Sequence, residues 1–395
     1  MKILVVCQYY YPEPFRISDI CEELLQRGHS VTVVTGVPNY PEGEVYKGYE
    51  KGNRRKEIIN GVKVYRCYTI PRKTGAVYRL LNYNSFSYSS SRFIDEFPGD
   101  FDVVFINQLS PIMMAKAGIK YAKKHKKPCV LYCLDLWPKS LAVGGINENS
   151  LIYKYYHRVS ARIYHAVDEI LITSRSFLDY FVKEFGIDKN MITYLPQYAE
   201  EIFSGIPYKE PRDICDLVFA GVIGTAQSVI TIVKAAEILK DDPVRFHVFG
   251  SGVELENLRK YADDHKLDNI IFYGRKPLEE MPEYYSMADA MLLTLQADPV
   301  LSMTLPGKLQ SYMSSGKPVI AAIDGEAQKV IEEAKCGYCS SAEDAEALAE
   351  NICRFVIDKD RQRLTQNAIT YYKQHFDKES FFDSLEVVFE KVINC

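Results

Sequence analysis

Two series of short apolar runs, each alternating with amphipathic helical stretches, constrain the fold of this chain more than any other feature. The first series opens with the apolar run Lys2–Val6 and a polar, aromatic loop. Ile17, Ile20, Cys21, Leu24 and Leu25 then follow at helical spacing, and Ser30–Thr35 is a second apolar run. This order predicts a strand, a helix and a strand, which together form a right-handed βαβ unit.

The same alternation continues along the chain. Residues 196–213 hold three prolines and a glycine without apolar periodicity, which indicates a linker. We therefore predict an α/β fold of two doubly wound, Rossmann-like domains, residues 1–195 and 214–375, followed by a helix over 376–395 that packs back on the first domain. The further predicted strands are Val103–Ile106, Cys129–Cys133 and Ile170–Thr173, and then Leu217–Gly221, Phe246–Phe249, Asn269–Tyr273, Ala290–Thr294 and Pro318–Ala322.

Composition narrows the class of protein. A hydrophobic content of 47% with 25% charged residues is typical of a globular chain of 395 residues, long enough for two cores. No apolar run of about 18 residues occurs, and the apolar run at the start, Met1–Cys7, is too short for a signal peptide. We therefore expect a cytoplasmic or peripheral protein.

Charge is unevenly distributed along the sequence. Residues 1–190 carry 27 Lys and Arg against 19 Asp and Glu, whereas the remainder carries 21 against 33. Basic and aromatic residues interleave at 153–164, which fits docking on an anionic membrane surface, although tyrosines that pack between helices explain the pattern nearly as well. We find no nucleic-acid recognition module.

A lysine stands at the start of a predicted helix within Thr304–Ala322. Pro306 suits the first turn, Gly316 and Pro318 suit the end, and a buried strand follows. The helix dipole disfavours a cation in the first turn, so Lys308 together with free N–H groups predicts a phosphate site. The alternative is a lysine that bends out to solvent.

Ligands of open α/β sheets bind at the carboxyl ends of the strands, and two such domains facing each other form a cleft there. In the second half, Gly221, Gly224 and Gly250 lie in these loops and could let the backbone approach a ligand, although each could equally be a turn glycine. Arg275 follows a strand directly. With Lys308 it would clamp a diphosphate, unless it pairs with a neighbouring glutamate.

In the first half, Asp135 and the sole tryptophan, Trp137, follow the strand Cys129–Cys133. Asp135 could hold an acceptor hydroxyl or accept its proton, or it could cap the next helix. Glu13 and Arg16 occupy a similar level after the first strand, so we expect them to line the same wall.

Metal and dinucleotide sites are not expected. Asp100 and Asp102 have the Asp-x-Asp spacing of some metal sites, but they precede a strand, at the end away from the cleft. The histidines lack ligand spacing, and no Gly-x-Gly-x-x-Gly follows the first strand. The sequence thus predicts no metal and no nicotinamide cofactor.

Five motifs, in order, make the whole chain resemble the retaining glycosyltransferases of family 4, which have the GT-B fold. The resemblance is to a bacterial capsule and O-antigen branch that includes N-acetylfucosamine transferases of the colanic-acid type. The motifs are Tyr10–Arg16, Gly28–Gly43, Asp135–Pro138, Phe219–Gln227 and Thr304–Met313.

This resemblance implies a metal-independent transferase that moves a sugar from a UDP-sugar, its substrate, to a polyprenyl-diphosphate-linked or polysaccharide acceptor. It needs no cofactor and works at the cytoplasmic face of the inner membrane. Asp135, Arg275 and Lys308 would be catalytic, and Glu13, Arg16 and Trp137 would bind the acceptor. The donor would contact Gly221, Gly224, Gly250, Arg275, Asp298, Thr304, Leu305, Pro306, Lys308 and Ser311.

The sequence departs from the family at its paired glutamates, whose positions are occupied by Met303 and Ser311. The contact to the ribose hydroxyls must then come from elsewhere, with Ser311 or Asp298 as substitutes. A nucleotide-sugar 2-epimerase of the same fold and a non-catalytic nucleotide-sugar-binding subunit are the alternative functions.

Overall fold

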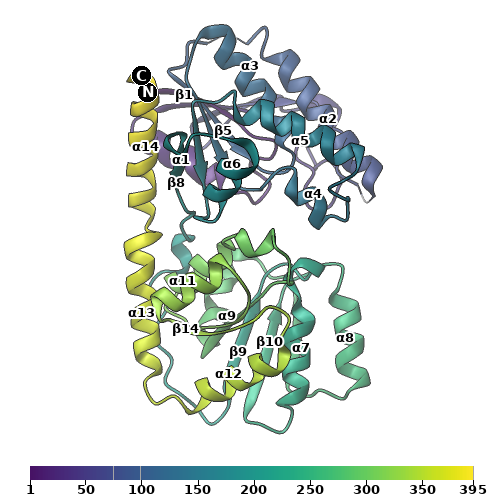
Figure 1. Ribbon diagram of the computed structural model, residues 1–395, viewed down its shortest axis with the longest axis vertical. Helices are drawn as coiled ribbons and strands as arrows, with labels where there is room; N and C mark the ends of the chain where they lie inside the picture. Colours follow the sequence, from purple (N-terminus) through teal and green to yellow (C-terminus); the bar gives the residue numbers. More distant parts are fainter. Residues whose placement is uncertain (74, 98, 395) are drawn as a thin grey trace. The chain divides into compact units, whose positions relative to one another are not determined.

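The computed structural model describes residues 1–73, 75–97 and 99–394, which divide into two compact units (Figure 1). Unit 1 comprises Met1–Thr173, Phe177–Leu195 and the end of the chain from Phe382 onward. Unit 2 comprises Ser174–Ser176 and Pro196–Phe381. No helix among the described residues is long and apolar enough to cross a membrane.

Unit 1 is built on an eight-stranded sheet in the order β3-β4-β2-β1-β5-β6-β7-β8. All neighbouring strands run parallel except β3 and β4. The first strand pairs with β2 on one side and β5 on the other, as a doubly wound sheet requires. The strands are β1 (Lys2–Val6), β2 (Ser30–Gly36), β3 (Lys56–Ile59), β4 (Val62–Cys67), β5 (Val103–Gln108), β6 (Cys129–Cys133), β7 (Glu169–Ile172) and β8 (Ile192–Tyr194).

Helices cover the faces of this sheet (Figure 1). The first helix buries Ile17, Ile20, Cys21 and Leu24, four of the five residues predicted at helical spacing, and leaves the fifth, Leu25, half-buried. The helices are α1 (Ile17–Gln26), α2 (Ala76–Phe93), α3 (Lys116–His125), α4 (Lys139–Val143), α5 (Leu151–Tyr164) and α6 (Phe177–Phe185), with short 3₁₀ turns η1 (Glu50–Gly52), η2 (Ile112–Ala115) and η3 (Lys189–Met191).

Unit 2 has a six-stranded, fully parallel sheet in the order β11-β10-β9-β12-β13-β14. Its strands are β9 (Cys215–Ala220), β10 (Val244–Phe249), β11 (Ile270–Gly274), β12 (Ala290–Thr294), β13 (Val319–Ala322) and β14 (Gly337–Ser340). Its helices are α7 (Val229–Ile238), α8 (Leu255–Asp264), α9 (Met281–Met287), α10 (Gly307–Ser314), α11 (Glu326–Ala334), α12 (Ala345–Ile357) and α13 (Arg361–His375), with η4 (Glu201–Phe203), η5 (Thr225–Gln227), η6 (Leu278–Glu280) and η7 (Leu301–Met303).

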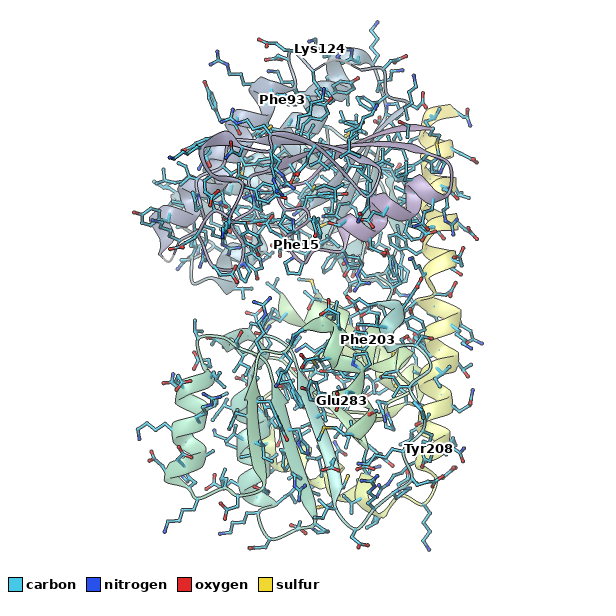
Figure 2. The ribbon with its side chains drawn as sticks, turned by 180° about the vertical axis from the view of Figure 1, so that it is seen from behind. Phe15, Phe93, Lys124, Phe203, Tyr208 and Glu283 are labelled. Atoms are coloured by element: carbon cyan, nitrogen blue, oxygen red, sulfur yellow. The ribbon has the colours of Figure 1, made fainter. Side chains whose placement is uncertain are left out.

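Residues 196–213, which the sequence suggests as a linker, are packed into unit 2. Phe203 (Figure 2) is buried and stacks on Tyr285, with ring centroids 4.5 Å apart. The Nζ atom of Lys209 lies 2.9 Å from Asp216 and 2.8 Å from Asp289. Stacking and a bridged ion pair therefore fix this segment against the sheet of its own unit.

The last helix, α14 (Lys378–Asn394), joins unit 1 from Phe382 onward. Arg27 contacts Asp383 at 2.9 Å and Glu386 at 3.2 Å, while Phe389 meets Phe105 edge-on. Glu169, a buried carboxylate, accepts a hydrogen bond from Lys391 at 2.8 Å. The end of the chain thus completes the core of the unit formed by its beginning.

Candidate functional site

The candidate site of unit 2 lies at the start of α10, which begins at Gly307, one residue after Pro306. Pro306 is the capping residue, and it brings no side-chain hydrogen bond to the first free N–H groups of the helix. Gly316, at φ +69°, ends the helical region and leads into β13. Lys308 is therefore the second residue of a helix whose buried face anchors it in the core.

The ammonium group of Lys308 has no hydrogen-bond partner among the described residues, although its nitrogen is buried. It lies 4.4 Å from the ring centroid of Phe219, the residue near the end of β9. Burial lowers the pKa of Lys308 to about 8. A buried cation without an acceptor is a destabilised group, and an anion beside it would offset this penalty.

Gly221 and Gly250 let two strand-end loops close around this lysine. The N–H of Gly221 donates to the carbonyl of Phe249 at 2.9 Å. A side-chain carbon at Gly250 would lie 1.8 Å from the Gly221 oxygen, and one at Gly221 would lie 3.1 Å from the Nζ of Lys308. The two positions therefore require glycine, with φ values of +148° and +155°.

Arg275 follows β11 at the same sheet edge, and the N–H of Gly250 donates to the carbonyl of Gly274 beside it at 2.9 Å. Its side chain is exposed. The carboxyl ends of β9, β10 and β11 thus bring Gly221, Gly250 and Arg275 to the edge at which Lys308 lies. The diphosphate clamp stays a prediction.

Ser311 lies one turn further along α10 and is buried. Its hydroxyl donates to the carboxylate of Glu200 at 3.2 Å. Sequence reasoning missed Glu200, because it comes from the segment read as a linker and no spacing connects it with α10. A carboxylate from another part of the chain therefore stands beside a position where the family has a glutamate.

The remaining predicted donor contacts of unit 2 have local structural roles. Asp298 accepts hydrogen bonds from the N–H groups of Val300 at 2.7 Å and Leu301 at 3.0 Å, so its carboxylate holds the loop before η7. The hydroxyl of Thr304 donates to the carbonyl of Leu301, and the side chain of Leu305 is buried. Gly224 precedes η5. Their contacts with a donor remain predictions.

In unit 1, Glu13 is buried and its carboxylate is engaged by the backbone. Its oxygens accept hydrogen bonds from the N–H groups of Asn39 at 2.9 Å, Tyr40 at 2.8 Å and Tyr10 at 3.3 Å. Burial raises the pKa of Glu13 to about 7, against the effect of these donors. The structure gives Glu13 the role of joining two strand-end loops. Arg16 is half-buried immediately before α1.

Asp135 lies after β6 in a polar cluster that includes residues missed by sequence reasoning. Its carboxylate accepts a hydrogen bond from the hydroxyl of Ser110, and the indole nitrogen of Trp137 donates to that hydroxyl at 2.7 Å. Burial raises the pKa of Asp135, while the Ser110 hydrogen bond and the charge of Arg72 act in the opposite direction. Helix α4 begins without a side-chain cap, so Asp135 does not cap it.

Aromatic rings surround this cluster. Phe15 (Figure 2) stacks on Tyr9 with centroids 4.9 Å apart, and Trp137, itself buried, meets Tyr83 edge-on. The guanidinium of Arg72 lies 5.8 Å from the Tyr83 centroid. Rings combined with a cation and a carboxylate suit a polar ligand that has flat apolar faces, such as a sugar.

The two candidate sites have different chemistry. The site of unit 2 offers a buried ammonium and helix N–H groups, which suit an anion. The site of unit 1 offers a carboxylate, hydroxyls and rings, which suit hydroxyl groups. Among residues 1–73, 75–97 and 99–394 there is no cluster of three or more His, Cys, Asp or Glu that could hold a metal ion.

Each of the two units matches a protein-family model. Residues 16–197 match the model described as Glycosyltransferase Family 4, and residues 207–371 match the model described as Glycosyl transferases group 1. The chain is 25% identical over 347 residues to a protein of Escherichia coli (strain K12) whose description reads "Putative colanic acid biosynthesis glycosyl transferase WcaI". That match covers 82% of this chain and 83% of WcaI.

Solved structures share the architecture along the whole chain. Sucrose-phosphate synthase from Thermosynechococcus elongatus has a TM-score of 0.77 at 15% identity, covering 100% of this chain and 99% of that one. Anabaena HepE, solved in complex with UDP and glucose, has a TM-score of 0.71 at 14% identity and covers 99% of each chain. At such low identity these similarities establish the fold.

Proposed function

Because the chain is a glycosyltransferase of the GT-B type, we propose that it transfers a sugar, with retention of configuration, from a UDP-sugar to a polyprenyl-diphosphate-linked or polysaccharide acceptor. We propose an N-acetylated hexosamine or deoxyhexosamine as the sugar, and surface polysaccharide assembly at the cytoplasmic face of a membrane as the setting. Similarity to WcaI, whose description names colanic acid biosynthesis, supports this choice.

The buried, unpartnered ammonium of Lys308 carries the donor half of this proposal. A diphosphate at the start of α10 would receive a charge-assisted hydrogen bond from Lys308 and further hydrogen bonds from the helix N–H groups. Arg275 would approach it from the neighbouring strand end. The UDP seen in HepE is a ligand of the same chemical class in a protein of the same fold.

In the proposed reaction, the bond between the anomeric carbon and the donor's β-phosphate oxygen breaks, and an acceptor oxygen bonds to that carbon on the same face. The acceptor proton passes to the departing phosphate oxygen. Lys308 and the start of α10 stabilise the negative charge that develops on this phosphate, so no metal is required. Asp135 would orient the acceptor hydroxyl from unit 1.

Glu200 would replace the missing glutamate of α10. Its carboxylate already accepts a hydrogen bond from Ser311, and a carboxylate can accept hydrogen bonds from the two hydroxyls of a ribose. Glu200→Gln should therefore weaken UDP binding by about 1.5 to 3 kcal/mol, the range for a hydrogen bond to a charged group. Ser311→Ala, which leaves the carboxylate in place, should have a smaller effect.

The test is a panel of nucleotide sugars, read first as the rise in melting temperature and then by calorimetry. UDP-hexosamines should bind, and Lys308→Met and Arg275→Ala should weaken that binding. Release of UDP should then require a lipid-linked sugar acceptor. If no nucleotide sugar bound, the proposal would fail.

The substitution of both family glutamates favours one alternative, a non-catalytic nucleotide-sugar-binding subunit. Binding of a UDP-sugar without turnover on any lipid-linked acceptor would support that function. An epimerase would instead change the sugar configuration without an acceptor, which analysis of the recovered nucleotide sugar would detect.

A further inference from the structure

Two neighbouring helices of unit 1 carry cations and no acidic residue. Helix α2 contains Arg79 and Arg92, and α5 contains Lys154, Arg158 and Arg162. Each of these five side chains is exposed. None has an ion-pair partner within the part of the chain that the structure describes. The helices therefore present positive charge that the protein itself does not neutralise.

The same helices expose large apolar side chains, which a stable fold normally covers. Leu151 is 85% exposed and Tyr88 is 70% exposed. On α5 the exposed residues Leu151, Tyr155, Arg158 and Arg162 follow helical spacing, so one face changes from apolar to cationic along the helix. Other exposed apolar residues on the two helices, among those whose burial is described, are Tyr78, Leu80, Leu81, Ile152 and Tyr155.

The two helices lie next to each other (Figure 1). The ring of Trp137 meets Tyr83 of α2 and Tyr156 of α5, each edge-on. Asn84 of α2 lowers the pKa of Tyr156 against the larger effect of burial, so the two side chains lie close together. Leu81 and Tyr88 stand one turn on either side of Asn84, so the exposed residues of α2 and α5 form one surface. We call it the α2–α5 face.

Helix α3 provides a contrast to the α2–α5 face. It too has lysines and no acidic residue, but it exposes no large apolar side chain. Lys120 is paired with Asp95 at 2.5 Å, and Lys124 (Figure 2) donates to the carbonyl of Asp95. Unpaired cations and exposed apolar groups therefore occur together on α2 and α5, which a solvated basic helix would not require.

We propose that the α2–α5 face docks on the surface of an anionic phospholipid bilayer. The cations would contact lipid phosphates, and Leu151, Ile152, Tyr155 and their neighbours on α2 would enter the boundary between headgroups and acyl chains. The argument for a bilayer over a protein partner is the charge complementarity, since every charge on these helices has one sign. The inference names the membrane partner of the proposed transferase but does not depend on its donor or acceptor.

The experiment is flotation of the full chain with vesicles, without nucleotide. Wild type should bind vesicles of phosphatidylcholine mixed with phosphatidylglycerol and should not bind phosphatidylcholine alone. The triple variant K154A/R158A/R162A should bind about a hundredfold more weakly, at about fivefold for each cation removed. The variant L151S/I152S/Y155S, which removes exposed apolar side chains, should show less vesicle binding than wild type at high salt.

The matched control is K116A/K123A/K124A, which removes the same charge from exposed positions of α3. It should bind within about fivefold of wild type, because its lysines have no apolar neighbours to insert. Circular dichroism and melting should be unchanged in all three variants, since every altered side chain is exposed.

The proposal would be overturned by no binding to anionic vesicles, by equal binding to phosphatidylcholine alone, or by equal losses in the α3 and α5 variants. The proposal would also be refuted if the α2–α5 face bound a purified protein but did not bind anionic vesicles. Because vesicle binding is measured without UDP-sugar or acceptor, a failure to bind vesicles would not contradict the proposed transferase activity. A failure of the transferase test would likewise not contradict the proposed membrane docking.

Discussion

Replacing Lys308 by Met should make the ligand-free protein more stable, although it removes a residue of the candidate site. Methionine fills a similar volume beside Phe219 and carries no charge to desolvate. Burial lowers the pKa of Lys308 from 10.5 to about 8. At 1.36 kcal/mol for each pKa unit, this corresponds to an upper value of about 3 kcal/mol gained at neutral pH.

The sign of the pH dependence follows from proton linkage. Between pH 8 and 10.5 the unfolded lysine retains its proton and the folded one has lost it, so the stability of the wild type rises with pH in this window. Lys308→Met should lack this rise. The measurement is urea unfolding of both proteins across the range, with the difference in the free energy of unfolding plotted against pH.

Lys317 is the matched control. Burial lowers its pKa to about 8 as well, but its ammonium donates to the carbonyl of Ala288 at 2.9 Å. Lys317→Met leaves that carbonyl unpaired and should destabilise the protein by about 1 to 3 kcal/mol, without affecting UDP binding. If Lys308→Met were also destabilising at pH 7, with an unchanged pH profile, the reasoning about an unpartnered cation would be refuted.

Three further predictions concern the same two sites. The affinity for UDP should fall as pH rises above 8, because the free lysine loses its proton there whereas the bound state needs it; calorimetry of Lys308→Met should show no such fall. Gly250→Ala should lower stability by about 1 to 3 kcal/mol and weaken UDP binding, because the new side chain would meet the Gly221 oxygen. The control is Gly186→Ala, at φ +64° with no atom within 4 Å of the added carbon, which should cost at most about 1 to 2 kcal/mol in unfolding curves. Burial raises the pKa of Glu13 to about 7, so the wild type should lose stability from about pH 4.5 to 7 relative to Glu13→Gln, and identical pH profiles would contradict this.

The alternation of apolar runs was sufficient to predict the α/β class and most strands, because parallel strands buried on both faces read as continuous apolar segments. It missed the β3–β4 hairpin, in which β3 is a strand of 4 residues at the edge of the sheet and pairs only with β4. The signal was present in the dipeptide Asn60–Gly61, where both residues have positive φ values.

Lys308 could be found from sequence because its oddity is local: a cation in the first turn of a helix. Its lack of a partner could not, since this depends on Phe219 and Gly221, which lie on a different strand and loop. Glu200 was missed for the same reason, because the contact with Ser311 joins residues 111 positions apart. Spacing rules apply within one element and carry no information about pairs such as this.

Asp135 and Lys308 are both ionisable groups whose charged form is disfavoured by burial, but they differ in what surrounds them. Asp135 has a hydrogen bond from Ser110 and lies near the positive charge of Arg72, so the protein already compensates part of its burial. Within the described part of the chain, Lys308 has neither a hydrogen-bond acceptor nor an opposite charge that shifts its pKa. An uncompensated charge gains more from an oppositely charged ligand, because no protein group already offsets its burial. The inference of an anion at α10 is accordingly stronger than the inference of any particular ligand at Asp135.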